Sequence, residues 1–131
     1  MKNTKQTKGK RKRAIARAAL YPGKGRVFVN GQSLDSFGNS ILRLRISEPL
    51  VLAADQAKTI DIHVNTFGGG ASGQADAVRL AIARALVNHD SKLKKVFDEY
   101  DRLLLVADVR RKETRKPNDS KARAARQKSY R

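Results

Sequence analysis

Residues 60–89 read IDIHVNTFGGGASGQADAVRLAIARALVNH and decide the fold of the chain. The first part alternates apolar and polar residues, which predicts a half-buried β-strand over residues 57–67. After the glycines, apolar residues recur at spacings of three and four, the pattern of one buried helical face: Val78, Ile82, Ala85 and Leu86. The stretch therefore predicts a strand, a tight turn and a helix that ends near His89. We expect Ser72 to cap this helix, with Asp76 placed favourably for the helix dipole.

The turn itself, from Gly68 to Gly73, satisfies the G-x-G-x-x-G pattern of dinucleotide-binding loops in the strand-to-helix context that the pattern requires. The acid that should end the next strand is absent, because Asp90 has the right spacing but follows the helix directly. A P-loop is excluded, since Gly73-Gln74-Ala75 stands where Gly-Lys-Ser/Thr is needed. Two interpretations stay open: the glycines permit a tight turn, or free N–H groups at the helix start bind a phosphate such as that of RNA.

Turn signals divide the first part of the chain. Residues 14–20 and 26–30 are rich in apolar and β-branched residues and flank the turn residues Pro22-Gly23, so they predict a hairpin. Asn30-Gly31 predicts a second turn.

Helical periodicity governs most of the remaining core. Residues 36–46 fit a helix or a strand, and we favour a helix that ends before Pro49. Residues 50–54 are left open between helical and extended structure. Residues 92–100 predict a second helix with one apolar face. Residues 103–107 predict either a final strand or an extended segment on the core.

The net charge of +17 is carried by the two ends of the 131-residue chain. Residues 1–26 hold ten Lys/Arg and no acid, residues 27–107 hold nine of each sign, and residues 108–131 hold ten Lys/Arg and three acids. We therefore expect one domain: an extended basic N-terminal arm over 1–13, a globular core over 14–107 and an extended basic tail beyond it. Two basic ends on a neutral core favour nucleic acid over a membrane surface, because neither end has an amphipathic apolar face.

No constellation of an active site is visible in the sequence. The chain has no cysteine, and His63 and His89 have no partner at metal or catalytic spacing. Ser72 lacks both the G-x-S-x-G arrangement and an identifiable base. No apolar run is long enough for a signal peptide or a membrane span. We expect no catalytic residue, no metal and no cofactor.

Several colinear segments resemble the ribosomal protein nine family of the small subunit, in its archaeal form. The segments are GKRKRAIAR (9–17), GKGRV (23–27) with Asn30-Gly31, EPL (48–50), GGG (68–70) with Gly73-Gln74, AIARAL (81–86), YDR (100–102) and QKSYR (127–131). The ending QKSYR is similar to the archaeal and eukaryotic branch, whereas the bacterial form usually ends in Ser-Lys-Arg.

This resemblance implies a structural protein of the ribosome in the cytoplasm, not an enzyme. Its fold would be α+β, a mixed β-sheet packed by helices with a left-handed βαβ crossover, an exception to the usual handedness. The protein would bind the 3′ major domain of small-subunit rRNA in the head, beside other head proteins, and thread its tail toward peptidyl-site tRNA. Two other classes of protein stay open. A nucleotide-dependent enzyme would bind free nucleotide at the glycine turn, and a DNA-packaging protein would co-purify with DNA.

The expected contacts lie in the arm, the glycine turn and the tail. The expected rRNA-binding residues are Lys8, Lys10, Arg11, Lys12, Arg13, Arg17, Gly69, Gly70, Gln74, Arg110, Arg111, Lys112, Arg115, Lys116, Lys121, Arg123 and Arg126. By position, the tRNA-binding residues are Lys128, Ser129, Tyr130 and Arg131. Tyr130 has no apolar neighbours and can offer its ring to a base, while the Arg131 guanidinium can grip a phosphate.

Overall fold

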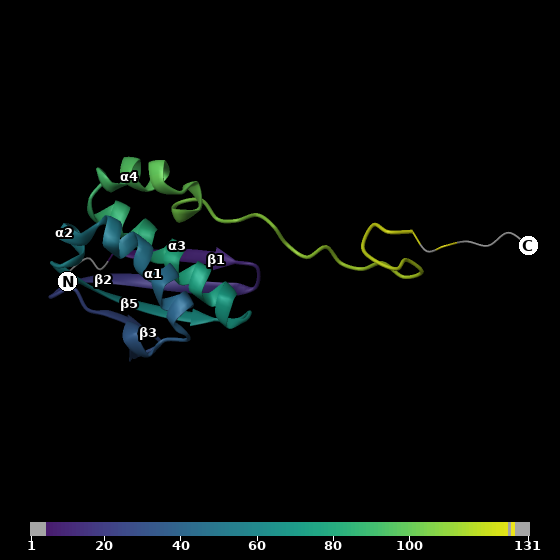
Figure 1. The fold of residues 1–131 in the computed structure, drawn as a ribbon, viewed down its shortest axis with the longest axis horizontal. Helices are drawn as coiled ribbons and strands as arrows, with labels where there is room; N and C mark the ends of the chain where they lie inside the picture. The colour runs from purple at the N-terminus through teal and green to yellow at the C-terminus, as the bar shows by residue number, and fades with distance from the viewer. Residues whose placement is uncertain (1–4, 126, 128–131) are drawn as a thin grey trace, which may run out of the picture.

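The computed structural model describes residues 5–125 and residue 127. It forms a single α+β domain in which helices pack on one face of a five-stranded mixed sheet (Figure 1). The strands are β1 (Gln6–Arg11), β2 (Ala14–Pro22), β3 (Val27–Val29), β4 (Gln32–Ser33) and β5 (Ile60–Phe67). The helices are α1 (Ser40–Leu52), α2 (Ala54–Ala57), α3 (Ala71–His89) and α4 (Leu93–Tyr100), with single 3-10 turns at η1 (Leu34–Ser36) and η2 (Arg102–Leu104). The predicted fold class, a mixed sheet packed by helices, is confirmed.

The order of strands in the sheet is β1-β2-β5-β3-β4. β5 pairs antiparallel with β2 and parallel with β3, so it lies at the centre. The predicted hairpin between residues 14–20 and 26–30 is therefore wrong, because β5 separates the two strands. The predicted Asn30-Gly31 turn is confirmed: both residues have positive φ, 53° and 79°, and join β3 to β4.

The segment expected as an extended arm contains an edge strand instead. β1 pairs antiparallel with β2, and Lys12 turns the chain between them with φ 52°. β1 was missed because the side chains it turns toward α3 are Thr7, Gly9 and Arg11 rather than apolar ones. Thr7 Oγ1 donates to the carbonyl of Ala81 at 2.8 Å, and Gly9 lies directly against the backbone of α3.

α3 fills the centre of the helical layer and contacts β1, β2 and β5. The four residues predicted for its buried face, Val78, Ile82, Ala85 and Leu86, are all fully buried. Small residues of β2 face it, so helix and sheet approach closely: Ala14, Ala16 and Ala18. The predicted Ser72 cap is wrong, since the N-cap is Gly70, which has no side chain to bond, and Ser72 Oγ accepts from Arg45 Nη1 at 3.2 Å.

The connection between the parallel strands β3 and β5 consists of β4, η1, α1 and α2. α1 runs past Pro49, where we expected it to end. Leu42, Ile46 and Pro49 are buried, so packing outweighs the single hydrogen bond that proline removes. Residues 50–54, left open from the sequence, are mostly helical. The left hand of this crossover stays a prediction.

α4 matches the helix predicted over 92–100. Residues 103–107 form no strand: the 3-10 turn η2 buries Leu104 completely, and the chain then runs on without regular structure. From Asp108 the tail extends away from the core, with one isolated bridge between Asp119 and Ala125 (Figure 1).

Candidate nucleic-acid interface

One end of the sheet gathers three segments that are far apart in the sequence (Figure 1). They are the β1–β2 turn, the glycine turn between β5 and α3, and the start of the tail. A Cβ on Gly68 would lie 2.6 Å from the carbonyl oxygen of Arg13, and Arg111 Nη1 donates to the carbonyl of Lys12 at 2.6 Å. We call this surface the basic end and define it by Lys12, Arg13, Gly69, Gly70, Gln74, Arg110 and Arg111.

The glycine turn is required by the backbone. Gly68 and Gly69 have φ of 75° and 62°, and a Cβ on Gly69 would lie 3.0 Å from the nitrogen of Ala14. Gln74 Nε2 closes the turn by donating to the carbonyl of Gly68 at 3.0 Å. The tight-turn interpretation is confirmed, and phosphate binding at Gly69 and Gly70 stays a prediction. In the residues described, β5 is followed by α3 and α4 without another strand, so the dinucleotide pattern lacks its second half.

Arg11 is held inside the molecule. Its side chain is only 16 % exposed and lies 3.6 Å from a carboxylate oxygen of Asp76 on α3 and 3.2 Å from one of Asp108 at the tail start. Arg45 of α1 approaches the other oxygen of Asp76 at 3.1 Å. These ion pairs join α1, α3, β1 and the tail, so we leave Arg11 out of the proposed RNA contacts.

Asp108 is the acid at the root of the tail. The Arg110 side chain and backbone N–H both bond it, at 2.7 Å and 2.9 Å, and with the nearby Arg11 they hold the pKa of Asp108 well below its usual range. The same contact raises the pKa of Arg110. Asp108 is thus ionised at neutral pH and fixes where the tail leaves the core.

The tail folds back on itself beyond Lys112. Glu113 accepts from Lys116 Nζ at 3.1 Å and from Arg123 Nε at 2.7 Å, which lowers the pKa of Glu113. Arg115 Nε donates to the carbonyl of Asp119 at 3.1 Å. The exposed tail cations Lys112 and Lys121 lie before and within this loop. The predicted contact residues Arg126, Lys128, Ser129, Tyr130 and Arg131 lie outside the described residues.

The remaining predicted cations, Lys8, Lys10 and Arg17, lie on the face of the sheet opposite the helices. β1 pairs Lys8 with Arg17, so their side chains stand side by side. The same face carries four rings that we did not select from the sequence: Tyr21, Phe28, His63 and Phe67. The alternation in residues 60–67 was the available signal, because it places Phe67 on the face of His63 rather than in the core.

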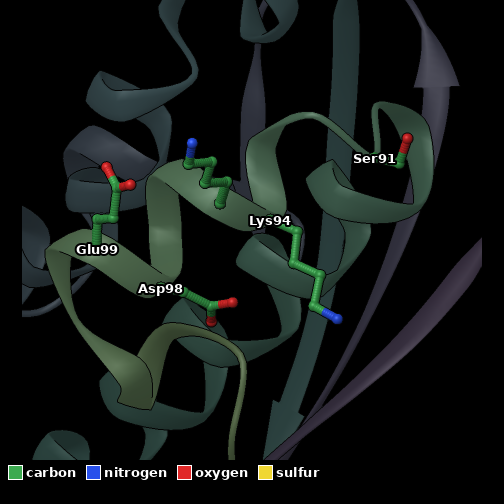
Figure 2. A pocket seen from close by; sticks show the side chains of 5 residues that line it. Ser91, Lys94, Asp98 and Glu99 are labelled. Atoms are coloured by element: carbon green, nitrogen blue, oxygen red, sulfur yellow. The ribbon is translucent and has the colours of Figure 1, made fainter.

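A hollow of about 450 Å³ lies on the outer side of α4, lined by Ser91, Lys94, Lys95, Asp98 and Glu99 (Figure 2). Lys94 and Lys95 each stand four residues before an acid, Asp98 and Glu99, a spacing that places opposite charges side by side on an exposed helix face. Figure 2 shows Ser91 and Glu99 at opposite ends of the hollow. Over residues 5–125 and 127, no group of three metal-ligating side chains occurs, and no helix is long and apolar enough to cross a membrane.

Comparison with known proteins assigns the chain to a family. Residues 9–131 match the family described as ribosomal protein S9/S16. The chain is 50% identical over 127 residues to the small ribosomal subunit protein uS9 of Thermoplasma acidophilum, covering 95% of this chain and 98% of that protein. It is 48% identical over 125 residues to uS9 of Pyrobaculum aerophilum, covering 94% and 88%, and 46% identical over 125 residues to uS9 of Methanothrix thermoacetophila, covering 94% and 95%. With its mixed α+β fold and basic end, the chain belongs to the ribosomal protein S9/S16 family.

Proposed function

We propose that this protein is a structural, non-catalytic component of the small ribosomal subunit that binds rRNA in the subunit head. Its tail would reach the anticodon stem-loop of peptidyl-site tRNA. The observation that carries the proposal is the convergence of three basic or glycine-rich segments at one end of a neutral core, with a basic tail leaving from the same end.

The basic end supplies the groups that a folded RNA backbone requires. Lys12 and Arg13 are exposed in the β1–β2 turn, and no bond from either side chain occurs within the described residues. Gly69 and Gly70 expose backbone beside them, and Gly70 has open space around it. Cations at this density neutralise phosphates and release their counterions, so binding gains free energy without reading base identity.

The tail is long enough to connect a core on the subunit head with a distant tRNA site. Residues 108–131 number 24 and would span about 80 Å if fully extended at ~3.3 Å per residue. The described part already runs outward from the core, although residues 113–125 form a compact loop (Figure 1). A core on the outside of the subunit head could therefore place the last four residues at an internal tRNA site: Lys128, Ser129, Tyr130 and Arg131.

Deletion of residues 129–131 tests the tail. Subunits reconstituted with the shortened protein should sediment normally but bind peptidyl-site tRNA at least fivefold more weakly, because a stacking ring and a guanidinium are lost. Lys121→Gln is the matched control, since it also removes one positive charge from the tail but keeps its end. Normal tRNA affinity of subunits that carry the shortened protein would rule out the tail contact, and failure of the full-length protein to enter small subunits would rule out the whole proposal.

A further inference from the structure

We propose that the face of the sheet opposite the helices is a second RNA-binding surface, on which an unpaired nucleotide stacks against a ring cluster. We call it the open face and define it by Lys8, Lys10, Arg17, Tyr21, Phe28, His63, Asn65 and Phe67. The proposal rests on the proposed function, because it takes the ligand to be a single-stranded segment of the same rRNA.

The ring cluster consists of Tyr21, His63 and Phe28 from three strands. The centroids of Phe28 and His63 are 4.9 Å apart at an interplanar angle of 24°, and Tyr21 meets His63 edge-on at 5.2 Å and 89°. Tyr21 is 43 % exposed. A hollow of about 330 Å³ opens at the cluster and is also lined by Gly31, Val64 and Asn65. This volume is close to the lower limit for pockets that bind small molecules, about 300 Å³, so the hollow is large enough for a nucleobase.

A second exposed ring lies farther along the same face. Phe67 is 51 % exposed, and the guanidinium carbon of Arg17 lies 6.0 Å from its centroid. Its cross-strand partner is Ile15, while Arg17 pairs with Asn65. An aromatic ring beside a cation is the arrangement that single-stranded RNA uses for stacking and phosphate neutralisation.

The charge of the open face favours a polyanion as the occupant. Lys8, Lys10 and Arg17 stand on its β1 and β2 strands. The one acid on the described strands of this face is Asp61, whose side chain is 7 % exposed. Asp61 Oδ1 accepts the backbone N–H groups of Lys24 and Arg26, each at 2.9 Å, and Arg26 Nη2 lies 2.8 Å from Oδ2. That carboxylate is neutralised, so the accessible charge of the face is positive.

The exposed surface of α1 is aliphatic and differs in this respect from the open face. Ile41, Leu44 and Val51 are 67 %, 70 % and 72 % exposed, and all three are aliphatic. Aliphatic side chains offer no π-face to a base. The open face combines rings, an amide and cations without free acid, which is the composition of sheet surfaces that bind single-stranded RNA.

A tryptophan reporter tests the stacking directly. The chain contains no tryptophan, so Tyr21→Trp in the full-length protein provides one signal at the ring cluster. Titration with a transcript of the 3′ major domain of small-subunit rRNA should quench this fluorescence saturably, because a stacked base quenches indole emission. Leu44→Trp, on the aliphatic surface of α1, is the matched control and should not be quenched.

Affinity for the same transcript gives the second measurement. Tyr21→Ala should weaken binding about tenfold, the loss expected for one stacked base. Tyr21→Phe keeps the ring and should bind within twofold of the wild type, as should Leu44→Ala. Circular dichroism of each variant checks that the fold is intact, and Tyr21→Leu replaces Tyr21→Ala if it is not, since it keeps apolar bulk without a ring.

The outcomes separate the two proposals. Quenching together with the tenfold loss supports the open face as an RNA site. If the wild type binds the transcript but Tyr21→Trp is not quenched and Tyr21→Ala binds normally, the proposal that RNA binds the open face is wrong. A neighbouring protein is then the alternative occupant of this face. If the wild type does not bind the transcript at all, the proposed function fails and the open face fails with it.

Discussion

Gly9 stands in the run KGKRKR of residues 8–13, where it looks like a spacer between basic residues. In the structure it determines how closely α3 approaches the sheet. A Cβ at this position would overlap the carbonyl oxygen of Ala77 and lie 2.7 Å from the nitrogen of Ala81. The sequence does not indicate this role, because the two residues that Gly9 contacts, Ala77 and Ala81, are 68 and 72 positions away. Gly73 differs, since its Cβ would meet neighbours only at ordinary van der Waals distance, 3.6 Å.

These two glycines should respond to alanine with opposite signs. Gly9→Ala should lower the free energy of unfolding by at least about 2 kcal/mol, because helix backbone cannot move aside as a side chain can. Gly73→Ala lies in the first turn of α3 and should be neutral or stabilise by up to about 1 kcal/mol through helix propensity. Urea unfolding of both variants measures the difference. Equal midpoints would show that α3 does not rest on β1 as described.

Elements with strong local periodicity were predicted correctly from the sequence, whereas the pairing of strands that lie far apart in the chain was not. β5, α3 and α4 each carry a clear apolar period, and all three were placed within a few residues. β2 and β3 were paired wrongly, because the strand between them comes 30 residues later and no local signal indicates that it inserts there. β1 was missed because its inward side chains are not apolar. At the site, the cations were selected from charge alone, whereas the rings of the open face needed the sheet register.

The root of the tail should loosen when Asp108 loses its charge. Asp108→Asn removes the ion pairs to Arg11 and Arg110, so tryptic cleavage after Arg110 and Arg111 should become several-fold faster at neutral pH. Glu113→Gln is the matched control, because it removes pairs of the tail loop and leaves the root intact. Equal cleavage rates in both variants and the wild type would contradict the anchoring role of Asp108.

Acid should have the same effect on the wild type. The folded pKa of Asp108 is depressed below the ordinary aspartate value of about 3.9, so its stabilisation is complete above that pH and is lost as the pH falls through the lowered pKa. The NMR signal of the Arg110 backbone N–H, which Asp108 accepts, should therefore stay constant from neutral pH to about pH 4 and shift only below it. In Asp108→Asn this titration should vanish.

For the whole molecule, the distribution of charge matters more than its total. The sequence places the excess at the two ends of the chain, and the structure brings part of the first basic segment, Lys12 and Arg13, beside the root of the tail, where Arg111 bonds the carbonyl of Lys12. Their convergence could not be inferred from composition, because it depends on β1 joining the sheet. The core between them remains electrically ordinary, with exposed lysines such as Lys94 and Lys95 four residues from acids.

The salt dependence of rRNA binding should show whether phosphates contact the basic end rather than the charges of the core. The double variant Lys12→Asn with Arg13→Gln should reduce the slope of log K against log salt by about two, one for each lost phosphate contact. Asparagine is chosen because Lys12 has φ 52°, which asparagine tolerates. The double variant Lys94→Gln with Lys95→Gln loses the same charge from α4 and should leave the slope unchanged. Equal slopes in the two variants would mean that RNA senses only the net charge.

The bond between Arg111 and the carbonyl of Lys12 also has a consequence for the order in which the chain is expected to fold. It joins residues 99 positions apart, and closing such a loop in an unfolded chain costs on the order of 4 kcal/mol of entropy. We therefore expect this contact to form only after β1 and β2 have docked on α3 and placed Lys12 beside the root of the tail. A growing chain whose core has not folded has no fixed direction for its last residues, so only a finished core presents the tail correctly.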